Sequence, residues 1–330
     1  MARGKKAGSQ ARTTPSWASW WVLGPVAIAL AIGGTLTYLA KSGTPPGPRE
    51  VFVTEIEHTH GLAVDPTDSR ILWIGGHGSL IRVTDGRQWI RVGTQTYDMM
   101  GFSVHPTEPN TLLTSGHPGP RDRRPNPLGV EISRDGGLSW KALALAGEAD
   151  FHAMTISRAD PRVIYAWNIS RRAGLYRSQD GGRGWEALGD RGLLGVYSLS
   201  AHPQQSEVVY AATTRGLYVS VDAGESWRSL SPALAGVPVT AVEVHPRDPQ
   251  SMYAYAADPE LGLIRSADGG MRWSSVGFFL GNRDAIGNLA LDPIDVRLLY
   301  FATHMGDLYR SRDGGKSREQ WVSRGKIGAP

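Results

Sequence analysis

The hydrophobic pattern divides the chain into two unlike parts. Residues 20–40 (WWVLGPVAIALAIGGTLTYLA) contain no charged side chain. They match the roughly 20 apolar residues needed to cross a bilayer. From residue 50 onward, short apolar runs alternate with polar positions and are separated by Gly, Pro, Asp and Ser. This second pattern is typical of short strands joined by tight turns. The sequence therefore predicts one apolar helix followed by an all-β domain.

The flanks of the apolar segment set its expected orientation. Aromatic residues lie near both ends of the segment, and basic residues precede it: Trp17, Trp20, Trp21 and Tyr38; Arg3, Lys5, Lys6 and Arg12. The positive-inside rule then keeps the N-terminus in the cytoplasm. We expect a basic cytoplasmic tail (1–18), a transmembrane signal anchor (19–41) and a Pro-rich linker (42–49). The alternative is a signal peptide cleaved near Ala40. Either places the β domain on the extracellular or periplasmic side of the cell membrane.

One motif recurs through the β domain. It is clearest at residues 133–140 (SRDGGLSW) and 220–227 (SVDAGESW), and it returns at 178–185 and 266–273. Two copies are degenerate, at 84–89 (TDGRQW) and 311–321 (SRDGGKSREQW). The six aspartates, spaced 42 to 50 residues apart, are Asp85, Asp135, Asp180, Asp222, Asp268 and Asp313. Such a period predicts one four-stranded blade per repeat, and hence a six-bladed β-propeller over residues 50–330.

The motif has a mechanical explanation. An Asp carboxylate can accept backbone N–H bonds across a hairpin turn, and Gly permits positive φ. The Trp opens the next strand and buries its ring between neighbouring sheets. We therefore interpret these aspartates as structural residues in the turns between the third and fourth strands of each blade.

The pattern S-x-D-x-G-x-[ST]-W resembles the Asp box, or BNR repeat. This repeat is found in sialidases, in VPS10-type sorting receptors and in photosystem II assembly factors. The resemblance covers about residues 50–330 and implies a propeller fold. The same scaffold carries enzymes and non-enzymes, so it implies no single activity.

The nine histidines fall into two sets. His105, His202 and His245 each precede a Pro in the turn after the first strand of a blade, where we expect turn formers. The other six are expected on the opposite face, because starts of first strands and ends of second strands share one side of the ring: His58, His60, His77, His117, His152 and His304.

The start of the innermost strand is expected to ring the mouth of the central channel. In blade order this position carries His60, Met100, His152, Tyr197, Thr240 and Gly287. Two residues earlier, on the same side of the strand, come His58, Asp98 and Asp150 in blades one to three. The sequence thus predicts a cluster of imidazole, thioether and carboxylate groups at one channel mouth.

This cluster suggests a transition-metal site. Imidazole with thioether suits copper, whereas imidazole with carboxylate suits zinc, nickel or iron. We favour copper, with His60 and His152 as core ligands, and with Met100, His58 and one of His77, His117 or His304 completing the site. Asp98 or Asp150 would orient an imidazole without touching the metal. The alternative is a polar lining of a water-filled channel.

A glycoside hydrolase is a second hypothesis, with Asp98, Asp150 and Tyr197 as its reactive groups. The sialidase-type arginine cluster is missing, because no position of an innermost strand is Arg. Any glycosidase here is therefore expected to have another activity. We lean toward a binding module over an enzyme.

A third hypothesis is an assembly or scaffold factor that binds a protein or carbohydrate at the same face. The connection at 117–128 (HPGPRDRRPNPL) is long, Pro-rich and basic, through Arg121, Arg123 and Arg124. It could serve as a lid, a docking loop or a plain solvated loop. Residues 50–57 are expected to add to the last blade and close the ring.

Composition excludes several chemistries. The chain has 330 residues and no cysteine, so disulfides, zinc–thiolate sites and iron–sulfur clusters are ruled out. The net charge is only +4, part of it in the first dozen residues. We therefore expect no nucleic-acid partner.

Overall fold

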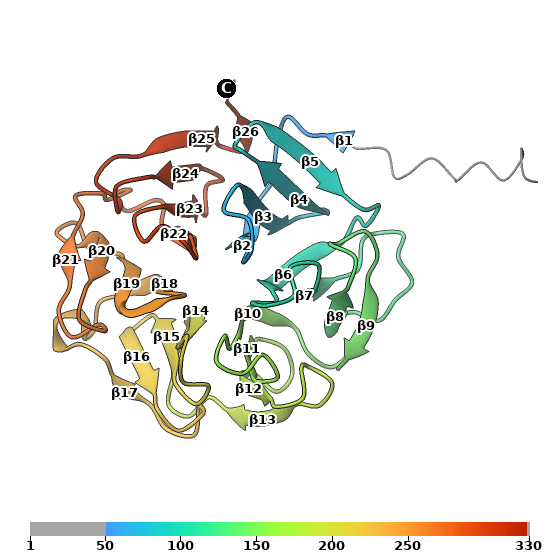
Figure 1. The fold of residues 1–330 in the computed structure, drawn as a ribbon. Coiled ribbons are helices and arrows are strands. Elements are labelled where there is room, and N and C mark those ends of the chain that lie inside the picture. Colours follow the sequence, from blue (N-terminus) through green and yellow to red (C-terminus); the bar gives the residue numbers. More distant parts are fainter. Residues whose placement is uncertain (1–50, 329–330) are drawn as a thin grey trace, which may run out of the picture. The chain divides into compact units, whose positions relative to one another are not determined.

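The computed structural model describes residues 51–328, and these form a ring of six antiparallel sheets (Figure 1). The six-bladed, all-β prediction is confirmed. Over the described range the one helical element is a single 3-10 turn, η1 (Pro232–Leu234). No helix between residues 51 and 328 is long and apolar enough to cross a membrane. The predicted tail, anchor and linker (1–49) lie outside the described residues.

Blades two to five are four-stranded sheets, each with its strands in chain order from the channel outward. Blade two contains β6 (Asp98–Val104), β7 (Leu112–His117), β8 (Val130–Ser133) and β9 (Lys141–Ala144). Blade three contains β10 (Phe151–Ile156), β11 (Ile164–Asn168), β12 (Gly174–Ser178) and β13 (Glu186–Gly189). Blade four contains β14 (Val196–Ala201), β15 (Val209–Thr213), β16 (Gly216–Ser220) and β17 (Arg228–Ser229). Blade five contains β18 (Val239–His245), β19 (Asp248–Ala256), β20 (Gly262–Ser266) and β21 (Ser274–Ser275).

Blades one and six each gain a fifth strand. Blade one contains β1 (Val51–Phe52), β2 (Thr59–Val64), β3 (Ile71–Gly76), β4 (Ser79–Thr84) and β5 (Gln88–Val92). Blade six contains β22 (Ile286–Leu291), β23 (Leu299–Thr303), β24 (Leu308–Ser311), β25 (Glu319–Ser323) and β26 (Lys326–Ile327). The six innermost strands, β2, β6, β10, β14, β18 and β22, surround the centre of the ring (Figure 1).

The hydrophobic core lies between the blades. Buried apolar side chains form six clusters, and each cluster draws residues from two neighbouring blades. The cluster that joins blade six to blade one contains Ile74, Trp89, Tyr300 and Trp321. Burial of apolar surface therefore closes the ring, because no blade buries its two faces alone.

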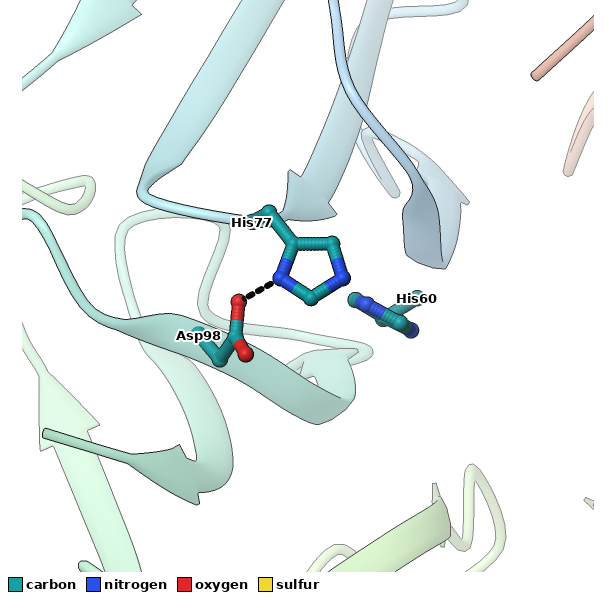
Figure 2. Close-up of side chains that lie close together, drawn as sticks. All are labelled: His60, His77 and Asp98. Carbon is teal, nitrogen blue, oxygen red and sulfur yellow. Dashed lines mark ion pairs between the residues drawn. The ribbon is translucent and has the colours of Figure 1, made fainter. Parts of the chain in front are cut away.

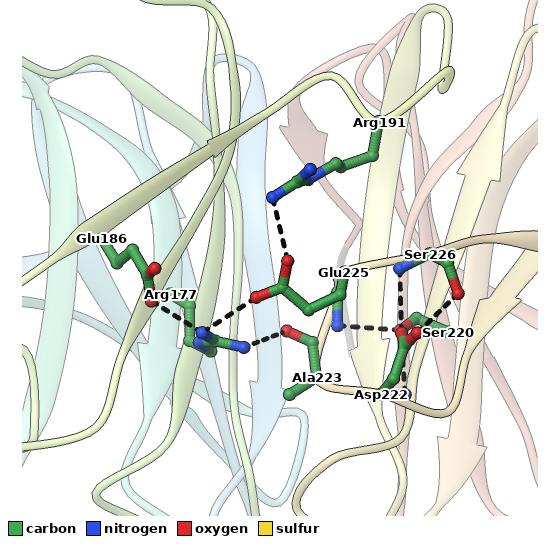
Figure 3. Close-up of polar contacts among 9 residues, drawn as sticks. Arg177, Glu186, Arg191, Ser220, Asp222, Ala223, Glu225 and Ser226 are labelled. Atoms are coloured by element: carbon green, nitrogen blue, oxygen red, sulfur yellow. Dashed lines mark hydrogen bonds and ion pairs between the residues drawn. The ribbon is translucent and has the colours of Figure 1, made fainter.

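The repeated Asp turns have the geometry expected from the motif. At Asp135 the carboxylate accepts hydrogen bonds from the Ser139 backbone N–H (2.9 Å) and hydroxyl (2.6 Å). The Ser133 hydroxyl also donates to Asp135 (2.8 Å). Figure 3 shows the equivalent turn at Asp222, whose pKa is lowered to about 2 by hydrogen bonds from Ser226. The turns are thus self-contained structural units.

The turn at Asp222 also contacts the preceding blade (Figure 3). Arg177 of β12 donates to the backbone oxygen of Ala223 (2.9 Å) and to the carboxylate of Glu225 (3.2 Å). Arg191 pairs with the other oxygen of Glu225 (2.9 Å). Polar contacts therefore reinforce the apolar seam between blades three and four.

The predicted ring closure is confirmed in part. Residues 51–52 form β1 and pair with β5 on the outer edge of blade one, whereas Glu55 forms an antiparallel bridge with Lys326 of β26 in the last blade. The last blade is completed by its own β25, because the long turn after Asp313 still allows residues 319–323 to pair with β24. The ends of the domain do meet: the Ile56 N–H donates to Gly325 (2.7 Å) and the Ile327 N–H to Thr54 (3.1 Å).

Candidate functional site

The site histidines lie where inner strands begin and where second strands end. His60 belongs to β2 and His152 to β10, and each sits at a register irregularity of its strand. A β-bulge of this kind inserts one extra residue into the strand and changes the direction in which the side chain of that residue points. His77 follows β3, and His117 ends β7. This face is opposite the Asp turns, as the strand order predicts.

The first group of side chains contains His60, His77 and Asp98 (Figure 2). His77 Nδ1 forms an ion pair with Asp98 Oδ1 across the junction of blades one and two. The rings of His60 and His77 lie 4.5 Å apart at an interplanar angle of 74°. One potential ligand atom from each residue lies within 4.8 Å of the other two.

The second group contains His117, Asp150 and His152, at the junction of blades two and three. His117 Nε2 and His152 Nε2 each lie 3.2 Å from Asp150 Oδ2. The Asp150 side chain is only 6% exposed, whereas the two imidazoles are 39% and 34% exposed. Both nitrogens therefore converge on one buried carboxylate oxygen from the open side of the channel mouth.

Electrostatics keep His60 neutral. Burial is the main cause that lowers its pKa to about 4, and the neighbouring imidazoles of His77, His152, His58 and His304 lower it further. His60 Nε2 is buried and has no hydrogen-bond partner among residues 51–328. A neutral imidazole with an unpaired nitrogen is the form that binds a metal ion.

His58 and His304 lie beside the first group. The His58 ring is 5.5 Å from that of His77 and 6.5 Å from that of His60. Burial lowers the pKa of His304, and the nearby Asp284 opposes this shift. The His304 ring occupies the space that a side chain at Gly287 would need. These two imidazoles extend the row of histidines into blade six.

The remaining expected residues lie apart from the two groups. In blade two the register irregularity falls between Met100 and Ser103, and Gly101 takes φ = 49°. Gly101 therefore lines the central cavity in the place expected for Met100, whose side chain is buried. Tyr197 also lines this cavity and is 45% exposed.

Asp98 and Asp150 lie within the two groups themselves. The sequence instead predicts carboxylates that only orient the imidazoles.

The central channel holds two small cavities. The one below the histidines has a volume of about 90 Å³, and the one toward the Asp turns has a volume of about 170 Å³. Glu243 of β18 lines both, and Arg158 lines the second. Glu243 was not predicted from the sequence. It lies between Val242 and Val244, away from the start of the strand where the channel residues were expected. Neither cavity approaches the roughly 300 Å³ or more of a typical small-molecule pocket.

The other three histidines have the turn role predicted for them. His105 Nδ1 accepts the backbone N–H of Glu108 (3.1 Å), and His245 Nδ1 accepts that of Asp248 (3.1 Å). His202 Nδ1 accepts that of Gln204 (3.2 Å). These side chains replace backbone acceptors in tight turns.

Comparison with known proteins yields no matching family model. The chain is 33% identical over 134 residues to a xyloglucanase of Hypocrea jecorina (strain QM6a). This match covers 34% of the chain but only 16% of that enzyme.

Solved structures share the fold. The GH74 enzyme of Niastella koreensis superposes with a TM-score of 0.62 at 16% identity, and the GH74 xyloglucanase of Xanthomonas campestris with 0.58 at 21%. Both matches cover 83% of this chain and 46% of the other. YCF48 from Cyanidioschyzon merolae superposes with a TM-score of 0.51 at 16% identity, covering 85% of this chain and 90% of the other. The chain thus spans about half the length of the GH74 enzymes, and it has a propeller fold structurally like theirs and like that of YCF48.

Proposed function

We propose that this propeller is a binding module for divalent transition-metal ions, held by the two groups at the channel mouth. The observation that carries the proposal is the second group, in which two imidazole nitrogens lie 3.2 Å from one carboxylate oxygen. In a tetrahedral site with metal–ligand bonds of about 2.0–2.1 Å, neighbouring ligand atoms are about 3.3 Å apart. Both of these nitrogen–oxygen distances therefore suit an ion bound between the three side chains.

The donor set determines which ions we propose. Each group offers two imidazoles and one carboxylate. Imidazole and carboxylate ligands suit divalent copper, zinc, nickel and iron, and Cu²⁺ binds most N/O sites more tightly than the other first-row ions. Among these ions we therefore propose copper, as Cu²⁺, as the first choice for both groups.

Metal content of the full-length protein tests the proposal. The protein is equilibrated with Cu²⁺, Zn²⁺ or Ni²⁺, freed of excess and analysed by mass spectrometry. We expect up to two ions per chain, loss of one in His60→Ala or in His152→Ala, and loss of both in the double variant. His202→Ala, on the opposite face, is the matched control and should retain both. Wild-type protein without metal, or a double variant with full content, would contradict the proposal.

We also propose that residues 19–41 anchor the propeller in the cell membrane, with residues 1–18 in the cytoplasm. The supporting feature is the uncharged run from residue 20 to residue 40 behind basic residues. Protease added to intact cells, or to spheroplasts where an outer membrane is present, should digest the propeller in this topology. Protection of the propeller until the inner membrane is broken would contradict it.

A glycoside hydrolase is the second candidate, supported by the 33% identity to a xyloglucanase over 134 residues. Asp98 and Asp150 would be its carboxylates. The geometry favours it less, because each of these carboxylates contacts a histidine and the adjoining cavity is small. Release of reducing sugar from xyloglucan, abolished by Asp150→Asn, would support this candidate.

A protein partner at the same face is a third candidate. The supporting observation is that a propeller of similar fold, YCF48, has been solved bound to D1 peptide. Pull-down of the full-length protein from membranes would test it, with loss of the partner on substitution of exposed residues at the channel mouth such as Tyr197 as the expected outcome.

A further inference from the structure

We propose that Asn126 is a positioning residue that fixes His117 with Nε2 as its metal-binding atom, and that it makes the His117/Asp150/His152 group the tighter of the two sites. This inference rests on the proposed metal-binding function. It assigns a role to the long connection between β7 and β8 of blade two.

The connection is held firmly against blade two. Arg124 pairs with Glu131, whose side chain is only 1% exposed, and it also pairs with Asp122 within the connection. The Arg124 guanidinium lies 4.6 Å from the centre of the Tyr97 ring. Arg124 is therefore an internal anchor, whereas Arg121 and Arg123 are exposed. A segment anchored in this way can hold a side chain in place.

The backbone ties the end of the connection as well. The Leu128 N–H donates to the Gly116 oxygen (2.8 Å), one residue before His117. The Gly147 N–H donates to the Pro127 oxygen (2.8 Å). Asn126 thus lies next to two fixed points and beside the imidazole that it contacts.

The contact between Asn126 and His117 defines the tautomer. His117 Nδ1 lies 2.8 Å from Asn126 Oδ1. An amide oxygen can only accept a hydrogen bond, so Nδ1 must carry the proton. In a neutral imidazole this leaves the lone pair on Nε2, which lies 3.2 Å from Asp150 Oδ2, so two acceptors face each other unless a cation or a proton lies between them. Metal-binding histidines are commonly fixed through the ring nitrogen that does not bind the metal.

Asp150 is fixed from its other side. Its backbone N–H donates to Asn168 Oδ1 (2.8 Å), which holds the start of β10 against the end of β11. Its carboxylate is buried, and Oδ1 has no hydrogen-bond partner within residues 51–328. A buried carboxylate oxygen without a partner is unfavourable, and a cation bound by both oxygens of Asp150 would satisfy it.

The first group lacks such support. His77 Nδ1 contacts Asp98, which is itself a member of the first group and not an outside residue such as Asn126. His77 lies in the short turn between β3 and β4, at the place that the long connection occupies in blade two. The second group is therefore better organised before metal arrives. Loss of such an outer contact typically weakens metal binding by about 10- to 100-fold.

The test compares Zn²⁺ affinities of full-length proteins that carry His60→Ala, so that only the second group is measured. Added to this background, Asn126→Ala should weaken Zn²⁺ binding by about 10- to 100-fold. Asn126→Asp keeps an oxygen acceptor and should restore most of the affinity. Arg121→Ala, an exposed change in the same connection, should have no effect. Thermal melting shows whether each variant is folded.

A second readout needs no metal. Nitrogen-15 NMR of the metal-free protein should show His117 protonated at Nδ1, and Asn126→Ala should give a mixture of tautomers. Unchanged Zn²⁺ affinity in Asn126→Ala, or a wild-type His117 without a proton on Nδ1, would overturn the inference. If the wild type binds no metal, the proposed function fails and the site ranking fails with it, whereas the tautomer still decides whether Asn126 positions His117.

Discussion

Replacement of Glu243 by glutamine tests the account of the central channel. Glu243 lines both channel cavities, and burial raises its pKa from 4.5 to about 8. The Ser200 hydroxyl and the charge of Arg158 oppose this shift but do not cancel it. The folded protein therefore keeps the Glu243 proton at neutral pH.

The sign of the pH effect follows from that shift. Between pH 4.5 and about pH 8 the folded state holds a proton that the unfolded state has lost. The free energy of unfolding must then fall as pH rises through this window, by up to about 1.4 kcal/mol per pH unit. At pH 7 the ceiling is about 3 kcal/mol, and the partial exposure of Glu243 to solvent lowers it, so we expect about 1–3 kcal/mol.

Glutamine stays neutral at every pH, so Glu243→Gln should remove this loss. Urea unfolding of the variant and the wild type at pH 5, 6.5 and 8 measures it. The variant should gain little at pH 5 and about 1–4 kcal/mol at pH 8, relative to wild type. Glu260→Gln, at an exposed loop position, is the control. Its free energy of unfolding should change with pH in the same way as that of the wild type. If the free energies of unfolding of Glu243→Gln and the wild type changed with pH in the same way, the assigned role of Glu243 would be refuted.

Three further outcomes follow from the fold and the site. Asp222→Ala should lower the free energy of unfolding by roughly 1–3 kcal/mol, because its carboxylate accepts bonds from Ser226 and Ser220; denaturation no different from wild type would contradict this. Gly61→Ala should destabilise by about 1–3 kcal/mol, because its Cβ would lie 2.5 Å from Phe102 Cβ; an unchanged melting temperature would show that the inner strands can move apart. Asp150→Asn should abolish metal at the second group while retaining it at the first, and loss of both ions would show that the groups are one site.

The fold was largely predictable because the repeat is visible in the chain. The spacing of residues such as Asp135 and Asp222 set the number of blades, and the alternating strand directions set which face each turn occupies. The complete fourth strand of the last blade was not predicted, because the degenerate last motif hid it at 319–323. The residues of that strand pair with β24 through backbone bonds, which depend little on the displaced Trp321.

The candidate site was predictable in its location but not in its grouping. Strand alignment placed His60 and His152 at the channel mouth as one pair, whereas they lie in separate groups in the structure. The missing information was contact between blades: the turn histidine of one blade meets the aspartate that begins the next, as in His77–Asp98 and His117–Asp150. A signal was present, because these residues occupy equivalent positions one repeat apart.

Local backbone geometry explains the other differences between the predicted and the observed site residues. The register irregularity of β6 involves Gly101, whose positive φ is open to glycine, so Met100 is buried and Gly101 lines the cavity. The contact of Asn126 with His117 depends on the path of the long connection between β7 and β8. The spacing of the repeats gives no information about that path.

Anomalous diffraction from crystals equilibrated with Zn²⁺ or Cu²⁺ shows directly whether the two groups bind metal. We expect two peaks, one bonded to His60, His77 and Asp98 and the other to His117, Asp150 and His152, with metal–ligand distances of about 2.0–2.2 Å. The second peak should be the stronger at limiting metal. Crystals without a peak at either group, or with metal at the His105 and His202 turns instead, would contradict it.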